Sequence, residues 1–565
     1  MKRTHAKPIR RTLLLIPILL ALALAGCAVG TAPVDATTAT AGETGEITGT
    51  IAETVVGTVT GTVVGTVVET AAGTTAIAEA TEPAEYDASA TPVRLTRGAT
   101  VRPTAPVGLR FSGMIDRTYF DALTAAYGEN AVKVGVIITA TENLTANSLD
   151  FTVESLDGCE AIVGEKYVRI DATIENSGAD SIPFNCVFSD LEKNDYETLY
   201  SAVAFVEVNG RILRYSSYLQ TINTARFIDV AETAFLDLSD TKSGKYRNEV
   251  TIGSQTKYSP YTAAQRETLA EICFPHSFTV MSYNVAVYDS PSGGAGWEGR
   301  DPAKVAETVL SASPDVVGFQ EVNQKGSKGW NSTLAQLAAD GGYTRLEGEY
   351  TWDGFEKNEI FFKTEKFDKL IEGTITFKKA ASDLSVPNTE NANNSLDKHG
   401  RTFHYVGLEQ KETGRKLLVV NTHLHYGGTG SGHEEDDKVR RFEIRTLLAW
   451  LEGQKETYPD VIVTGDLNAH YNAAVASNGG TRNMKVFFDG GFERTSDTAK
   501  IKGDLDGTLA SGSQRASRDL RYTFDYVLTR GDFSTVFYSV VDNPIDNQNS
   551  YPSDHIPVMA EICFR

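Results

Sequence analysis

The stretch Val461-Ile-Val-Thr-Gly-Asp-Leu-Asn468 lies in the C-terminal half of this chain of 565 residues. Its first four residues are β-branched, which predicts a buried strand. Gly465-Asp466 is a turn signal at the end of that strand. Because α/β sheets and sandwiches place ligands where their strands end, Asp466 and Asn468 are candidates for a functional site and not only for a structural turn.

Apolar strands followed by polar residues recur from residue 278 to residue 562. Helical segments are expected between them, over 302–312 and over 437–454, where apolar residues recur at broadly helical spacing. The alternation predicts a domain that mixes strands and helices. The expected strands cover residues 278–283, 315–320, 359–363, 416–421, 461–464, 523–528 and 556–562.

Polar residues stand at the ends of these strands in a fixed order. Each short motif alone is weak evidence, since a single Asn after a strand is usually a cap. Taken together, the motifs resemble those of the endonuclease/exonuclease/phosphatase superfamily, which includes deoxyribonuclease I, exonuclease III, sphingomyelinase C and inositol-polyphosphate phosphatases. The resemblance covers residues 276–565 and implies an α+β fold, a four-layer αββα sandwich. The motifs are Ser282-Tyr-Asn284, Gln320-Glu321, Asn358-Glu359, Asn421-Thr-His423, Gly465-Asp-Leu-Asn468, Phe524-Asp525 and Ser553-Asp554-His555.

The residue types in these motifs suit a hard divalent cation. Mg²⁺ and similar ions prefer carboxylate and carbonyl oxygens to thiolates. By resemblance, Glu321 binds the principal metal with Asn284, and Asp554 completes that site or a second one. Asp466 and Asn468 supply further oxygens: Asp466 orients or deprotonates the attacking water, and Asn468 holds a phosphate oxygen. The expected cofactor is Mg²⁺ or Mn²⁺, with Ca²⁺ as a structural or auxiliary ion.

Two histidine–carboxylate pairs are also expected, His423 with Glu359 and His555 with Asp525. A carboxylate on one imidazole nitrogen fixes the tautomer and raises the pKa of the ring. Such a histidine can exchange a proton near neutral pH. The resemblance assigns these pairs to acid–base work and to stabilisation of the pentavalent phosphorus.

These residues predict metal-dependent hydrolysis of phosphate esters, most simply a phosphodiesterase or nuclease that uses in-line attack of water. The net charge of −21 argues against a broad basic face for polyanions. A local strip of Arg515, Arg518 and Arg521 is the candidate for phosphate contacts with DNA or RNA. The alternatives are an enzyme of the sphingomyelinase or phospholipase C type, an inositol or sugar phosphomonoesterase, and a non-enzymatic adhesin.

Residues 1–27 have the pattern of an export signal. Basic residues precede the apolar run Leu13–Leu24, which is about a dozen residues long, whereas a spanning helix needs ~20. The run ends in Leu24-Ala-Gly-Cys27, which resembles the lipobox of bacterial lipoproteins. The resemblance implies cleavage before Cys27, lipidation of its sulfur, and a chain anchored on the extracytoplasmic face of the cell membrane.

The rest of the chain is expected to form three parts: a low-complexity tether over 28–105, a mostly β accessory domain over 106–272, and the catalytic domain over 273–565. The tether is rich in Thr, Ala, Gly and Val and lacks the aromatic residues that a core needs. The accessory domain has no catalytic motif, and contact with cell wall or carbohydrate is one hypothesis for it. Cys273 with Cys563, and Cys159 with Cys186, could form disulfides. A monomer is expected.

Overall fold

The computed structural model describes residues 80–82, 91–174, 180–239, 248–252, 255–285, 302–322, 330–351, 356–392, 400–427, 433–474, 479–511, 517–542 and 551–565. The predicted signal, the lipid site Cys27 and the tether up to residue 79 lie outside these residues. The predicted end of the tether at residue 105 is wrong, because Val93 and Val101 belong to strands that pack in the core of the domain that follows. Among the helices in the described ranges, none is long and apolar enough to cross a membrane.

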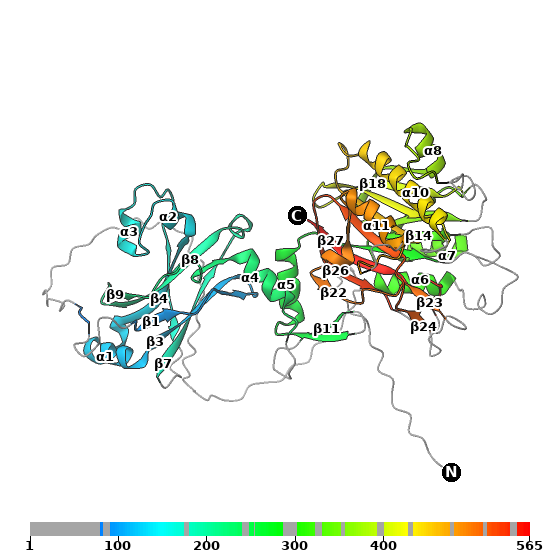
Figure 1. Cartoon of the computed structure of the whole chain (residues 1–565). Coiled ribbons are helices and arrows are strands. Elements are labelled where there is room, and N and C mark those ends of the chain that lie inside the picture. The colour runs from blue at the N-terminus through cyan, green and yellow to red at the C-terminus, as the bar shows by residue number, and fades with distance from the viewer. Residues whose placement is uncertain are drawn as a thin grey trace, which may run out of the picture.

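Residues 93–239 form two antiparallel sheets, which we call the β module (Figure 1). One sheet has the order β1-β3-β7-β6, with β2 on β3; the other has the order β10-β8-β4-β5, with β9 on β8. The central strands β4 and β8 are buried along most of their length, which fits their Val- and Ala-rich sequences. The strands are β1 (Val93–Leu95), β2 (Thr100–Arg102), β3 (Gly108–Asp116), β4 (Val132–Ala140), β5 (Val168–Asp171), β6 (Thr173–Ile174), β7 (Ser181–Ser189), β8 (Leu199–Val208), β9 (Arg211–Tyr215) and β10 (Thr224–Arg226), and the helices are α1 (Arg117–Tyr127), α2 (Thr141–Thr145), α3 (Val153–Gly158) and α4 (Phe227–Leu236).

A hairpin and a helix connect the β module to the C-terminal domain. The hairpin consists of β11 (Asn248–Ile252) and β12 (Gln255–Ser259), and the helix is α5 (Ala263–Cys273). Thr262 caps α5 and forms a capping box with Gln265. Leu269 and Phe274 share one hydrophobic core with the β module and with Cys563 of the last strand. The two parts of the chain are therefore packed together through α5, which lies between them in Figure 1.

Two larger sheets form the C-terminal domain. The first has the order β15-β16-β14-β13-β27-β26-β22, and the second has the order β17-β18-β19-β20-β25-β21. Their strands are β13 (Phe278–Asn284), β14 (Val316–Val322), β15 (Tyr343–Leu346), β16 (Lys357–Lys363), β17 (Phe367–Thr376), β18 (Thr402–Gln410), β19 (Lys416–His423), β20 (Val461–Asp466), β21 (Glu493–Arg494), β22 (Ile501–Lys502), β25 (Asp525–Arg530), β26 (Phe533–Val540) and β27 (Val558–Phe564). A separate hairpin joins β23 (Leu509–Ser511) to β24 (Ser517–Asp519).

Helices cover the outer face of each sheet. One core between the sheets draws Val280 from β13 and Val419 from β19. A second core joins the first sheet to α6 (Pro302–Ala312) and α7 (Trp330–Asp340). A third joins the other sheet to α8 (Phe377–Asp383), α10 (Glu434–Glu452) and α11 (Gly479–Asp489), and a short α12 (Thr495–Thr498) follows. Three cores between four layers confirm the predicted αββα sandwich.

The sheet topology brings the motif residues to one end of the sandwich. β13 runs parallel to β14, and β19 runs parallel to β20, so Asn284, Glu321, His423 and Asp466 all lie at carboxyl ends of strands. Asp466 at the end of β20 is paired with Asp525 at the start of the antiparallel β25. These five strands thus position polar side chains that are far apart in sequence.

The two disulfides considered from the sequence are not formed, because Cys159, Cys186, Cys273 and Cys563 are free thiols. Cys159 packs with the small cluster around α2 and α3, whereas Cys186 lies in the main core of the β module, so the fold separates them. Cys273 and Cys563 pack in the same core, and burial raises the pKa of each thiol to about 12. Both therefore behave as small apolar side chains.

Candidate functional site

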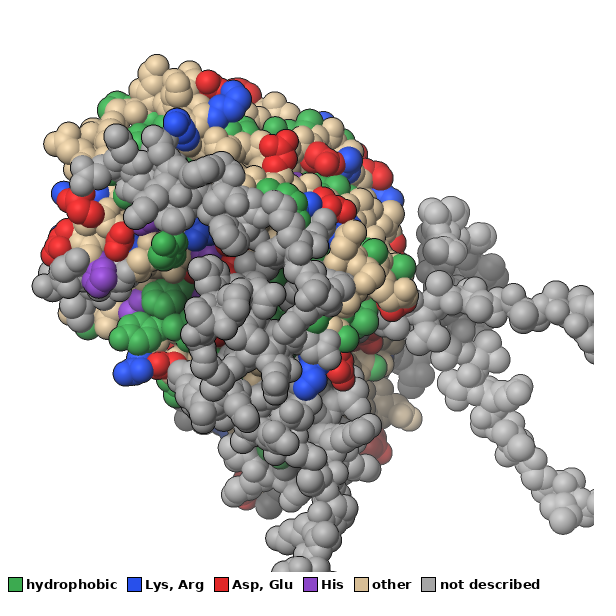
Figure 2. Space-filling view, turned by 90° about the vertical axis from the view of Figure 1, so that its right-hand side faces the viewer, with side chains coloured by type: hydrophobic (Ala, Val, Ile, Leu, Met, Phe, Trp, Pro, Cys, Tyr) green, Lys and Arg blue, Asp and Glu red, His purple; other side chains and the backbone are tan. Residues whose placement is uncertain are grey.

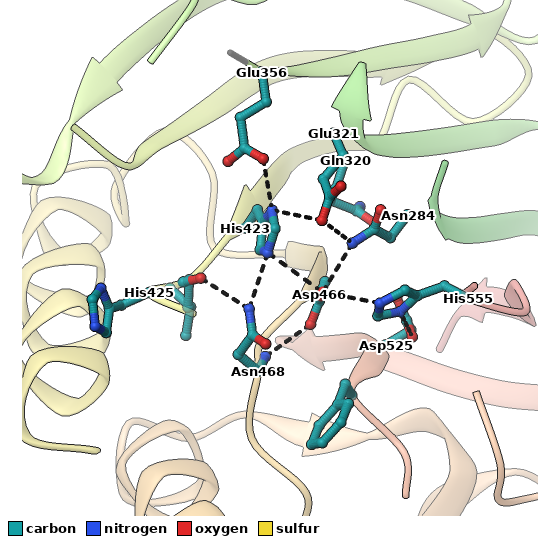
Figure 3. Close-up of polar contacts among 12 residues, drawn as sticks. Asn284, Gln320, Glu321, Glu356, His423, His425, Asp466, Asn468, Asp525 and His555 are labelled. Carbon is teal, nitrogen blue, oxygen red and sulfur yellow. Dashed lines mark hydrogen bonds and ion pairs between the residues drawn. The ribbon is translucent and has the colours of Figure 1, made fainter. Parts of the chain in front are cut away.

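Asp466 is at the centre of the polar cluster (Figure 3). Its Oδ2 accepts a hydrogen bond from Asn284 Nδ2 at 2.9 Å, and its Oδ1 accepts one from the backbone N–H of Asn468 at 2.9 Å. The same carboxylate lies 3.4 Å from His423 Nε2 and 3.6 Å from His555 Nε2. Burial alone would raise the pKa of Asp466, but His555 and His423 outweigh it and lower the pKa below the usual value. Asp466 is therefore an ionised carboxylate between two imidazoles.

Glu321 reaches the cluster through an irregularity in its strand. The register between β14 and β16 shifts between Phe319 and Val322, and Glu321 has a positive φ of 57°. Bulges of this kind redirect side chains and are common beside active sites. Glu321 Oε1 accepts a hydrogen bond from Asn284 Nδ2 at 3.0 Å, so the buried Asn284 connects Glu321 to Asp466.

The predicted pairing of Glu359 with His423 is wrong. Glu359 is fully buried and binds the guanidinium of Arg345 through two hydrogen bonds, at 2.8 and 3.0 Å. Glu356 instead lies 3.2 Å from His423 Nδ1 through its Oε2 (Figure 3). The reason is the period of two in an extended chain: Glu356 and Glu359 are three residues apart and therefore point to opposite faces.

Carboxylates surround His423, but its burial and the neighbouring Arg401 oppose its protonation more strongly. Burial and the guanidinium of Arg401 together lower the pKa of His423 to about 4, opposite to the direction expected from the sequence. Arg401 Nη1 lies 2.8 Å from His423 Nδ1 and also contacts Glu356. The amide nitrogen of Asn468 lies 3.0 Å from Nε2 and donates to the carbonyl of Leu424 at 3.1 Å. His423 is thus a neutral imidazole at pH 7.

His555 and Asp525 form the second pair, as the sequence indicated. His555 Nδ1 lies 2.8 Å from Asp525 Oδ2, and both residues are largely buried. Burial would lower the pKa of His555, but the carboxylates of Asp525 and Asp466 outweigh it and raise the pKa well above its ordinary value. At neutral pH, His555 is therefore the imidazolium and His423 the neutral ring.

A layer of buried polar side chains behind the cluster joins the two sheets. Gln320 of the first sheet donates through Nε2 to Asn421 Oδ1 of the second at 2.6 Å. Asn421 Nδ2 in turn donates to the backbone carbonyls of Phe319 and Glu359, at 2.7 and 2.9 Å. Because every one of these groups is buried, the network fixes the distance between the sheets at the end that carries the site.

Asp554 is held near Asn284 because the preceding residue, Ser553, binds the main chain of Asn284. The hydroxyl of Ser553 donates to the backbone carbonyl of Asn284 at 2.8 Å, and the carbonyl of Asp554 accepts from the N–H of Ala510 at 2.8 Å. The half-buried Asp554 is therefore held beside the site by its main chain.

The predicted arginine strip is not a single surface. Arg518 is only 10% exposed in its side chain and forms ion pairs with Asp504 and Asp542 at 3.2 and 3.5 Å, which makes it a structural residue. Arg521 is 75% exposed and pairs with Asp519. Arg515 lies outside the described residues. Of the two arginines that can be placed, Arg521 alone has the exposure that a phosphate contact needs.

Two groups of the described side chains have ligand atoms close enough to hold a cation. Glu321, Glu356 and His423 form one group, and Asp466, Asp525 and His555 form the other; within each group the atoms lie within 4.8 Å of one another. Carboxylate oxygens dominate both, which suits Mg²⁺ or Mn²⁺.

Glu356 and Arg401 were not singled out from the sequence. The period of two in a strand shows that Glu356 and Glu359 cannot both face His423, but it does not show which of the two does. Arg401 directly precedes β18, the neighbour of the strand that carries His423, but a single arginine before a strand carries no recognisable motif.

Residues 281–555 match the model of the "Endonuclease/Exonuclease/phosphatase family". This match supports the assignment of the C-terminal domain to that superfamily. The matched segment begins within β13 and ends at His555, so it holds the site residues and the sandwich except for the start of β13 and the last strand, β27.

Among curated proteins, the chain is 25% identical over 354 residues to the CCR4-Not complex 3'-5'-exoribonuclease subunit Ccr4 of Saccharomyces cerevisiae, covering 54% of this chain and 41% of that protein. It is 23% identical to the CCR4-NOT transcription complex subunit 6-like-A of Xenopus laevis, covering 51% and 64%. The chain therefore spans less than two thirds of the length of these relatives.

Solved structures with a similar chain include an endonuclease/exonuclease/phosphatase family protein from Bacteroides thetaiotaomicron, at 21% identity and a TM-score of 0.40, covering 51% of this chain and 98% of that one. Another is a mannosyl-6-phosphatase from the same species, at 21% identity and a TM-score of 0.39, covering 51% and 100%.

Proposed function

We propose that the C-terminal domain hydrolyses phosphodiester bonds with a bound divalent cation, Mg²⁺ or Mn²⁺. The observation that carries this proposal is the position of the ionised Asp466 between a neutral histidine and a protonated one, at hydrogen-bond distance from Asn284. The family match is consistent with it, and Ccr4, to which the chain is similar, is named as an exoribonuclease.

The first group of side chains fits the cation best. Glu321 and Glu356 supply hard oxygen ligands, and His423 adds a neutral nitrogen. A cation bound there would neutralise the charge that develops on the phosphoryl oxygens. The carbonyl of Asn284 is anchored by Ser553, and its amide nitrogen binds both Glu321 and Asp466, so this residue orients the carboxylates of both groups.

Asp466, His555 and Asn468 have three different roles in the proposed reaction. As an ionised carboxylate, Asp466 accepts the proton of the attacking water while holding that water in line with the leaving oxygen. His555, protonated and oriented by Asp525, donates a hydrogen bond to the charge that develops on the phosphoryl group. Asn468 Nδ2, which contacts His423 Nε2 and donates to the carbonyl of Leu424, would exchange its contact with His423 for a phosphate oxygen of the substrate.

The experiment compares hydrolysis of single-stranded DNA and RNA, supercoiled plasmid, sphingomyelin and inositol phosphates, with Mg²⁺ or with EDTA. Cleavage of a nucleic acid that needs the cation is the expected result. Glu321→Gln should abolish it, whereas Glu365→Gln, which changes an exposed turn after β16, should leave it unaffected. Release of phosphocholine without nucleic-acid cleavage would contradict the nuclease assignment and favour the phospholipase C alternative.

We further propose that the enzyme acts outside the cell as a lipoprotein anchored through Cys27 and that it is a monomer. The support is the basic n-region, the short apolar run and the Cys27 motif of the sequence. Metabolic labelling with a fatty-acid analogue should mark the wild-type chain and not Cys27→Ser. Equal labelling of both chains would refute the anchor.

The β module is proposed to contact cell wall or carbohydrate. A pull-down of the chain on purified cell wall tests this proposal.

A further inference from the structure

An exposed aromatic stack lies on the segment that leads into Asp525. The ring of Tyr522, which is 38% exposed, stacks on Phe524 with centroids 5.8 Å apart and an angle of 12° between the planes. The edge of His470 meets Tyr522 at 5.6 Å. Among the described phenylalanine and tyrosine side chains, Tyr522 and Tyr426 are the exposed ones.

The stack is connected to the site through the main chain. Phe524 directly precedes Asp525, the partner of His555, and its carbonyl accepts from the N–H of Leu467 at 2.8 Å. The N–H of Thr523 donates to His470 Nδ1 at 3.1 Å. The loop that carries Asp466 and the segment that carries Asp525 are therefore held together directly beneath the two rings.

Tyr426 is the second exposed aromatic side chain and lies three residues after His423 in the sequence. It is 50% exposed, and its ring lies 5.5 Å from that of His425 at an angle of 30°. The guanidinium of Arg401, which contacts His423, is 5.9 Å from the centre of the Tyr426 ring. Figure 2 shows histidines gathered with hydrophobic and basic side chains on this face of the molecule.

Each exposed ring therefore has a guanidinium beside it. Arg521 is 5.4 Å from the centre of the Tyr522 ring, as Arg401 is from Tyr426 at 5.9 Å. Exposed tyrosines are common on protein surfaces and one alone would need no explanation. Two exposed rings that adjoin residues of the site match a ligand with a flat ring. The guanidinium groups add no free charge, because Arg521 pairs with Asp519 and Arg401 pairs with Glu356.

We propose that Tyr522, supported by Phe524, stacks against the base of a nucleotide whose phosphate is the one cleaved, and that Tyr426 borders the opposite side of the substrate. The inference rests on the proposed function and specifies its substrate as a polynucleotide with unpaired bases. Stacking on an aromatic ring tolerates any base. The rings of Tyr522 and Phe524 are nearly parallel, an arrangement that a planar base can extend.

The test uses three chromogenic diesters that release the same p-nitrophenolate: thymidine 5′-(p-nitrophenyl phosphate), methyl p-nitrophenyl phosphate and glucose 6-(p-nitrophenyl phosphate). The wild-type chain should prefer the thymidine ester. Tyr522→Ala should reduce that preference about tenfold through a higher KM, since stacking contributes ~1–3 kcal/mol per base. Tyr522→Phe should retain the preference, and Leu384→Ala, a change to an exposed side chain after α8, serves as the control.

Two outcomes would overturn the inference: an unchanged preference in Tyr522→Ala, which includes an equal loss with all three esters, or a loss relative to the methyl ester that is as large for the glucose ester as for the thymidine ester. The last would indicate a sugar instead of a base. If no ester is hydrolysed, the proposed function fails separately. Binding of oligothymidylate in EDTA then decides the inference, since Tyr522→Ala should weaken it about tenfold and Tyr522→Phe should not.

Discussion

Glu356 Oε2 lies 3.2 Å from His423 Nδ1, whereas Glu359, three residues further on, is buried against Arg345. The two carboxylates flank the start of the same strand and occupy opposite faces of it. One therefore belongs to the site and the other to the fold. Their different positions lead to different expectations for the two amide variants.

Glu356→Gln should lower kcat at least tenfold, because it removes a charge next to His423 and the cation group, and it should also lower the free energy of unfolding, because Arg401 loses its buried partner. Glu359→Gln should lower the free energy of unfolding but leave kcat nearly unchanged. It leaves the guanidinium of Arg345 buried without its counter-charge, which costs about 3 kcal/mol. Steady-state kinetics and urea unfolding on both variants check these expectations. A loss of kcat in Glu359→Gln and not in Glu356→Gln would support the pairing of Glu359 with His423 that was expected from the sequence.

Asp525→Asn should shift the alkaline limb of the kcat/KM profile to lower pH. The Asp525 and Asp466 carboxylates keep the pKa of His555 above its ordinary value despite burial, so the wild-type ring stays protonated as the pH rises through 7. Removal of one carboxylate lowers that pKa, and the protonated form is then lost at a lower pH. Profiles recorded between pH 5 and 9 test the shift; an alkaline limb at the same pH in both chains would exclude His555 as its source.

His404 should make the fold less stable in mild acid. Burial lowers its pKa from 6.5 to about 4, and Nδ1 is bound to the carbonyl of Asn358 at 3.0 Å. The unfolded chain therefore takes up this proton first as the pH falls, so stability is complete above pH 6.5 and decreases by about 3 kcal/mol down to pH 4. The free energy of unfolding of His404→Asn, measured in urea, should depend less on pH across this window than that of the wild-type chain. The same pH dependence in both chains would show that His404 is not its source.

Arg518→Ala should lower the melting temperature, because Asp504 and Asp542 lose their common partner and the carbonyl of Gly507 loses a hydrogen bond. Arg521→Ala should not, since its side chain is 75% exposed. It should instead weaken nucleic-acid binding and reduce the dependence of that binding on salt concentration. Thermal melts and binding titrations at two salt concentrations separate the two arginines. Equal melting temperatures for both variants would show that Arg518 is dispensable to the fold.

The sandwich could be predicted because its strands are apolar runs and its motif residues occur in a recognisable order. α6 begins and ends at the predicted residues, and α10 begins at Glu434 instead of residue 437, because its acidic first turn favours the helix start. The strand that carries Asp466 was expected from its β-branched residues alone.

The partner of His423 could not be predicted in the same way. It depends on which face of a strand each of two glutamates occupies, and the residues before Glu356 give no fixed register. Arg401 depends on the pairing of β18 with β19 over a long separation in sequence. Arg518 was predicted to be a surface residue because sequence does not reveal that Asp504 and Asp542 fold against it.

The core that α5 shares with β27 has a mechanical consequence. Leu269 and Phe274 are buried with Cys563, one residue before the end of the last strand, and Lys500 forms an ion pair with Glu232 of α4 at 2.5 Å. A force applied to the N-terminal side of the β module would therefore be transmitted to the C-terminal end of β27, which is the end of that strand opposite to the site. The active-site end would keep its geometry while that opposite end bears the force.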